Sequence, residues 1–190
     1  MSGTPSAGLV ARVAALAVVV VFFQIGVVSE VPVFGVNADL TPLLVAFVGL
    51  QCGSTLGAIT GFAVGLLVDL ALLQTLGISS LVFTLIGYWA GRLRELRDPQ
   101  AALTPVLVGA AAAAASLIGY SLMEFLLGVD APVSLDLLRQ IVLGTFVDTI
   151  VAIPMWAIVR RVLEGALPED PRRRRRRAYT TGGLSPLSKA

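Results

Sequence analysis

GLQCGSTLGAITGFAVGLLVDLALL, residues 49–73, has a glycine at every fourth position, and an aspartate takes the next step of the same spacing. The glycines are Gly49, Gly53, Gly57, Gly61 and Gly65, and the aspartate is Asp69. In water this would be a poor helix, because each interior glycine costs about 1 kcal/mol relative to alanine. In a bilayer an apolar segment satisfies its backbone by being helical, and bare glycine surface lets a second helix approach closely. The stretch therefore predicts a transmembrane helix whose glycine face packs either inside its own bundle or against a partner's transmembrane helix.

The composition of the whole chain also indicates a membrane protein. Hydrophobic residues make up 56% of the chain and charged residues 14%, which is too apolar for a soluble domain. Histidine is absent and Cys52 is the single cysteine, so imidazole chemistry, an internal disulfide and a cysteine-cluster metal site are excluded. The sequence contains no Walker loop, no GxSxG and no HExxH. We therefore expect a protein that is not an enzyme, with no catalytic residues, no metal and no cofactor.

Apolar runs predict an all-α integral membrane protein with six transmembrane helices in one domain, residues 1–163. The expected spans are about 9–28, 40–51, 54–73, 76–91, 105–127 and 137–161. The run over 40–73 would be about 51 Å long as one helix, too long for one span, so we expect a break in the polar cluster at 51–54. Segment 40–51 is only about 18 Å long, which leaves a re-entrant segment as the alternative to a full crossing. In the fifth span, the alanine block 110–115 favours close helix packing.

Basic residues predict the orientation of the bundle. The loop over 92–100 contains three arginines, whereas the loops over 29–38 and 128–135 contain no basic residue. The positive-inside rule then puts both termini in the cytoplasm. Residues 164–190 form an expected disordered basic tail, with Arg172, Arg173, Arg174, Arg175, Arg176 and Arg177 in one block. This block either anchors the topology or tethers the tail to anionic membrane lipids or an acidic partner. Nucleic acid is not expected, because no aromatic platform accompanies the arginines.

Three carboxylates fall inside expected spans: Asp69, Glu124 and Asp148. Charged groups are costly in lipid and mark candidate functional sites. One interpretation is a proton or cation pathway, or a buried contact with a partner. The other is a polar clasp between helices, for which Arg139 is the candidate partner of Glu124.

A run of these residues resembles the rod shape-determining protein MreD family. The matching positions are Gly53, Gly57, Gly61, Phe62, Gly65, Leu66, Asp69, Leu76, Gly77, Gly87 and Tyr88. The resemblance implies a non-enzymatic scaffold of the cell-elongation complex in the bacterial cytoplasmic membrane. It also implies binding to MreC and, through MreC, to the MreB filament and to RodA with its class B penicillin-binding protein. The family is also similar in architecture to the substrate-capture subunits of energy-coupling-factor transporters.

That similarity provides the alternative function, a small-molecule binding subunit of a vitamin-type transporter. Such a subunit needs convergent polar and aromatic groups on the outer side. The chain has only 13 aromatic residues, and both tryptophans, Trp89 and Trp156, are expected near the inner face. The sequence therefore favours the scaffold.

Overall fold

The computed structural model describes residues 6–28, 36–73, 75–96, 103–128 and 135–166, and these residues form six α-helices. The helices are α1 (Ala7–Gly26), α2 (Leu40–Cys52), α3 (Ser54–Ala71), α4 (Ile78–Leu96), α5 (Thr104–Leu126) and α6 (Leu135–Glu164). Their order is that of the expected spans, although α4 runs past the expected end at residue 91 to Leu96. The block Arg172–Arg177 lies outside the described residues.

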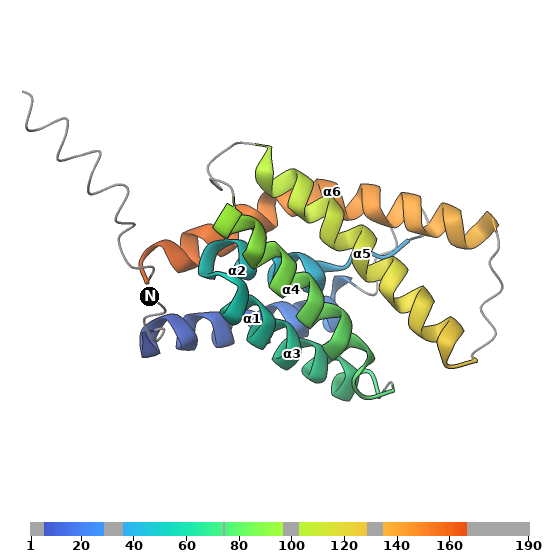
Figure 1. Ribbon diagram of the computed structural model, residues 1–190, viewed down its shortest axis with the longest axis horizontal. Helices are drawn as coiled ribbons and strands as arrows, with labels where there is room; N and C mark the ends of the chain where they lie inside the picture. Colours follow the sequence, from blue (N-terminus) through green and yellow to red (C-terminus); the bar gives the residue numbers. More distant parts are fainter. Residues whose placement is uncertain (1–5, 29–35, 74, 97–102, 129–134, 167–190) are drawn as a thin grey trace, which may run out of the picture.

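Helix α2 is the centre of the bundle (Figure 1). It packs against each of the other five helices, and every residue from Leu40 to Gln51 is buried. A helix of this length spans about 20 Å, less than the hydrocarbon core of about 30 Å. Because protein surrounds α2 on all sides, neither of its ends has to reach the bilayer surface to find polar partners.

A single residue, Gly53, separates α2 from α3. Its φ of +98° lies in the left-handed region that glycine adopts without steric cost. The chain therefore reverses direction there, at the polar cluster where the break was expected. Helices α3 and α4 then form the most extensively packed pair in the bundle, joined by a turn that ends at Gly77, whose φ is +102°.

Within the described residues, four helices are long and apolar enough to cross a membrane by length and composition: α1, α3, and most of α5 and α6. Helix α2 is a shorter apolar helix. Large apolar side chains are exposed around the bundle, including Phe22 of α1, Phe62 of α3, Ile118 of α5 and Ile153 of α6. Exposed surface of this kind is stable in lipid and unfavourable in water, which fits a membrane bundle.

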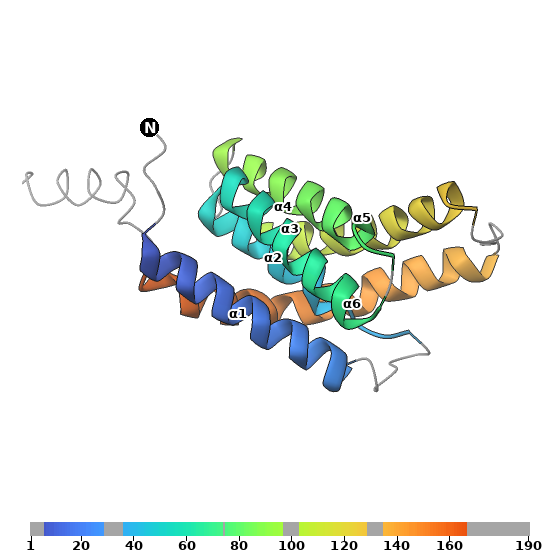
Figure 2. The same ribbon diagram turned by 90° about the horizontal axis from the view of Figure 1, so that it is seen from below.

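The start of α1 lies beside the end of α6 (Figures 1 and 2). Arg12 of α1 donates from Nη1 to the carbonyl oxygen of Val162 at 3.2 Å. Arg94 of α4 lies close to Gly53 at the break between α2 and α3. One end of the bundle therefore gathers arginines from α1, α4 and α6. Toward the opposite end, α5 and α6 extend beyond α3 and α4 in both views.

Candidate functional site

The glycine face of α3 lies against α4. A Cβ atom added at Gly57 would overlap the carbonyl oxygen of Gly87, and one added at Gly61 would overlap the carbonyl oxygen of Phe83. A Cβ at Gly65 would overlap the backbone of Ser80. Backbone therefore meets backbone along this contact, which we call the glycine seam. The seam is covered by the protein itself, so it offers no free surface to a partner helix.

Two of the expected glycines depart from a single continuous helical ridge. Gly49 belongs to α2, where it packs against Gly87 and Gly91 of α4. Gly53 forms the break between the helices, and only the side chain of Arg94 lies within 4 Å of a Cβ built there. The four-residue spacing of the glycines thus continues across the break between α2 and α3. Gly53 allows the turn there, and its backbone lies against Gly91 of α4.

On the α4 side, the glycine seam contains a pair of glycines whose role in packing was not expected from the sequence. Gly87 and Gly91 of α4 lie four residues apart, and a Cβ at either would overlap backbone of α3 or of the α2–α3 break. The signal was present in the segment GYWAG, residues 87–91. Small residues on both helices allow the close approach that lipid-embedded helices use.

Asp69 lies at the end of α3 and caps the start of α4. Its side chain is fully buried. Oδ2 accepts a hydrogen bond from the amide of Gly77 at 2.7 Å, and Oδ1 accepts one from the amide of Ser79 at 3.3 Å. The first amides of a helix lack intrahelical partners and carry partial positive charge, so a carboxylate there is doubly favourable. Tyr120 of α5 extends this cluster by donating to Ser79 Oγ at 2.8 Å.

Asp148 of α6 performs the same task for α2. Its side chain is almost completely buried, and Oδ1 accepts from the amide of Asp39 at 2.8 Å. Gln24 of α1 accepts from the amide of Leu40 at 3.0 Å and donates to the carbonyl of Ala38 at 2.8 Å. Asp39 itself accepts from the amide of Thr41 at 3.0 Å. Side chains from three segments therefore satisfy the start of the most deeply buried helix.

The other two expected polar residues are Arg139 and Glu124. Arg139 is exposed near the start of α6. Glu124 belongs to α5, but its side chain lies outside the described residues, so the Glu124–Arg139 pair stays a prediction. Asp69 and Asp148 bind different helix ends. In the described part of the chain, no three histidine, cysteine, aspartate or glutamate side chains gather as a metal site would require.

A cavity of about 450 Å³ lies between α4 and α5, and its lining is almost entirely apolar. It lacks the convergent polar groups that fix a soluble ligand. The transporter alternative therefore gains no support from it.

These features define a class: an all-helical membrane bundle whose buried aspartates and close-packed glycines hold its own helices together. A sequence model of the rod shape-determining protein MreD family matches residues 9–165, which include all six helices almost completely. The chain belongs to the MreD family, and its membership indicates a role in determining cell shape. Searches among curated proteins and among solved structures found no match. The similarity to transporter capture subunits therefore stays a prediction.

Proposed function

We propose that this protein is a non-enzymatic scaffold of the rod complex that binds the transmembrane helix of MreC in the cytoplasmic membrane. Through MreC it would reach the MreB filament and the peptidoglycan synthase formed by RodA and its class B penicillin-binding protein. The observation that carries this proposal is the family match over residues 9–165.

The hydrogen bonds of the buried aspartates support a scaffold function. Asp69 and Asp148 each hold the start of a neighbouring helix through short hydrogen bonds. Groups committed in this way are poorly placed to take up or release protons from a bound substrate. The glycine seam likewise fixes α3 on α4 and leaves the exposed apolar side chains as the surface available to a partner.

Site-specific photo-cross-linking in cells tests the proposal. A photoreactive amino acid replaces one exposed apolar residue on each of the five peripheral helices: Phe22, Phe62, Trp89, Ile118 and Ile153. If MreC docks as a helix, we expect adducts with MreC at one or two neighbouring positions, because a helix touches only one face of a bundle.

Phe47 is the matched control, because its side chain is fully buried in α2 and should give no adduct with another protein. Rod shape and protein level are recorded for every variant. The proposal is wrong if none of the five exposed positions reacts with MreC in cells that make both proteins at normal levels.

A further inference from the structure

The turn between α3 and α4 carries three exposed leucines, Leu72, Leu73 and Leu76, which we call the leucine tip. Leu73 is 92% exposed. Three leucines gathered on one turn form an apolar surface that is unfavourable in water. The leucine tip therefore requires contact with something apolar outside the bundle.

The backbone of Leu73 supports such a contact. Its φ of +51° lies in the left-handed region, which is unfavourable for a residue with a Cβ atom and is usually occupied by glycine or asparagine at the end of a helix. A leucine side chain that stayed in water would gain nothing to offset this conformational cost. Removal of the side chain from water would offset it.

Helix lengths indicate how far the leucine tip reaches across the membrane. Helix α6 has exposed arginines toward both ends, and Arg139 and Arg160 lie about 32 Å apart along it, which matches the hydrocarbon core of about 30 Å. From Gly77, just before α4, to the exposed Arg94 the distance along the helix is only about 26 Å. The pair α3–α4 is thus about 6 Å shorter than the distance between the charged positions of α6.

Charge places this shortfall at the leucine tip. The guanidinium of Arg94 has to stay near the polar boundary on its side of the membrane, whereas the three leucines of the tip carry no charge. Helix α3 agrees with α4, because it begins beside Arg94 and its 18 residues span about 27 Å before the tip. The positive-inside rule predicts that the arginine end is cytoplasmic, so the tip belongs to the outer leaflet.

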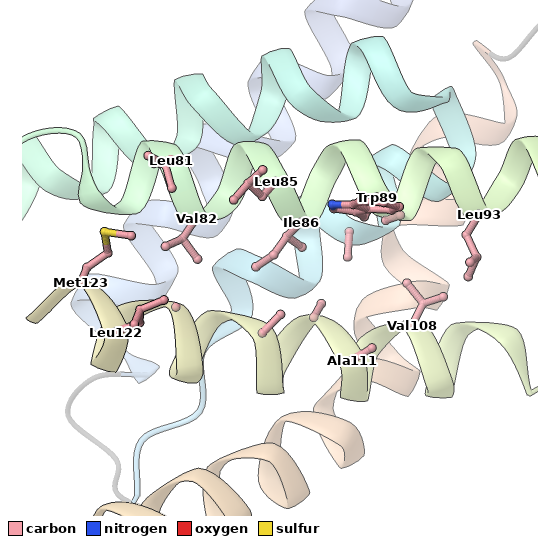
Figure 3. Close-up of a pocket in the computed structure, with 15 residues that line it drawn as sticks. Leu81, Val82, Leu85, Ile86, Trp89, Leu93, Val108, Ala111, Leu122 and Met123 are labelled. Carbon is pink, nitrogen blue, oxygen red and sulfur yellow. The ribbon is translucent and has the colours of Figure 1, made fainter. Parts of the chain in front are cut away.

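The exposed side of α4 continues into the leucine tip without a polar residue. Leu81, Leu85 and Trp89 follow one another along α4 (Figure 3), and all three are exposed. Between Leu76 and Leu85 every exposed residue is a leucine or Gly77. No side chain on this face therefore marks a place where α4 would leave the hydrocarbon core before the tip.

The first amides of α4 have partners that do not depend on water. Asp69 is fully buried and accepts hydrogen bonds from the amides of Gly77 at 2.7 Å and Ser79 at 3.3 Å. Amides at a helix start otherwise need water, which the hydrocarbon core lacks. The carboxylate of Asp69 therefore allows the turn to end below the membrane surface.

We propose that the leucine tip lies inside the hydrocarbon of the outer leaflet and contacts acyl chains there, about 9 Å from the centre of the bilayer. This depth is half of the hydrocarbon core, about 15 Å, less the shortfall of about 6 Å. The partner of this surface is lipid, and the turn between α3 and α4 ends within the membrane.

Depth-dependent fluorescence quenching tests the proposal on the purified full-length chain in phosphatidylcholine vesicles. Trp89→Phe and Trp156→Phe remove the two native tryptophans, and Leu73→Trp introduces a single tryptophan at the tip. Phosphatidylcholines brominated at different depths of the acyl chain then give the distance of this tryptophan from the bilayer centre. We expect about 9 Å, together with weak quenching by acrylamide in the water.

The matched control is Leu127→Trp in the same background. Leu127 is also an exposed leucine at the end of a helix, but α5 has 23 residues and extends beyond α3 and α4 in both views (Figures 1 and 2). Its tryptophan should lie about 15 Å or more from the centre and be quenched strongly by acrylamide. Leu76→Trp is the second probe of the tip, because Leu73 is the described non-glycine residue with a positive φ.

Two results would overturn the proposal. Tip tryptophans about 15 Å or more from the bilayer centre, with acrylamide quenching equal to that of Leu127→Trp, would place the turn at the membrane surface. A protein adduct from a photo-cross-linker at Leu76 in cell membranes would show that a partner, and not lipid, covers the tip. Thermal unfolding in detergent confirms that each variant is folded, and Leu76→Trp decides the test if Leu73→Trp does not fold.

Discussion

Asp69 and Asp148 are both buried acceptors at helix starts, but they accept different numbers of hydrogen bonds. Asp69 accepts with both oxygens, whereas Asp148 accepts from the described residues with Oδ1 alone. Asparagine retains one acceptor and turns the other into a donor. Asp69→Asn should therefore leave one buried amide without a partner and lower the free energy of unfolding by about 1–3 kcal/mol. Asp148→Asn keeps its single bond and should cost clearly less, as thermal unfolding in detergent would measure.

Substitutions of the two aspartates also distinguish a purely structural polar clasp between helices from a function that needs a charged carboxylate. If both aspartates act only as helix caps, Asp148→Asn supports normal rod shape when its protein level matches the wild type. Loss of rod shape at an unchanged level and melting temperature would instead indicate a proton or cation pathway through Asp148. Asp148→Ala is the control, because it removes the acceptor and should destabilise the fold in either case.

The glycine seam is the contact that fixes one element on another. Gly61→Ala places a methyl group on the backbone of α4 at Phe83, and overpacking of this kind costs about 1–3 kcal/mol. Gly8→Ala in α1 is the matched control, since nothing lies within 4 Å of its added Cβ. That control should be neutral or stabilising by up to about 1 kcal/mol through helix propensity. Melting temperature and the yield of folded protein provide the measurement.

The cross-link to MreC provides the outcome that would contradict this prediction. If Gly61→Ala melts like the parent protein yet gives no cross-link to MreC, then the glycine face contacts MreC and not α4. If the glycine seam lies inside the bundle, Gly61→Ala should lower the melting temperature, and MreC binding should fall only because the fold is destabilised.

The helices themselves could be predicted from the sequence because their signals are local. Apolar run length and the spacing of glycines act within one helix, and both α2 and α3 begin at the expected residues. The contact between Asp148 and Asp39 joins residues 109 positions apart, and the sequence around either residue does not indicate it. Asp69 continues the spacing of the glycines, but that spacing does not indicate which helix Asp69 caps.

The alanine block of α5 shows the same limit at the level of whole elements. Its composition predicts close packing. Helix α5 does pack against α6, and at Gly109, just before the alanine block, an added Cβ would overlap Ala152 of α6. On the side of α4, Ala111 and Ala115 line an open groove. Small residues permit a close approach, but the remaining contacts of each helix decide whether it occurs.

Among the residues that the structure describes, the arginines are unevenly distributed. Arg12, Arg92, Arg94, Arg160 and Arg161 lie at the starts or ends of α1, α4 and α6 that share one end of the bundle. Arg139 lies near the other end of α6. The positive-inside rule predicts that this arginine-rich end faces the cytoplasm.

Cysteine labelling in intact spheroplasts checks this orientation. Cys52→Ser removes the single native thiol, and one cysteine is then introduced at Ala7, at Leu127 or at Glu164, all of which are exposed at helix ends. A membrane-impermeant maleimide should label Leu127→Cys directly, because the positive-inside rule predicts that the end of α5 faces outward. Ala7→Cys and Glu164→Cys should react only after the membrane is permeabilised. Labelling of Ala7→Cys or Glu164→Cys in intact spheroplasts would show that the bundle has the opposite orientation.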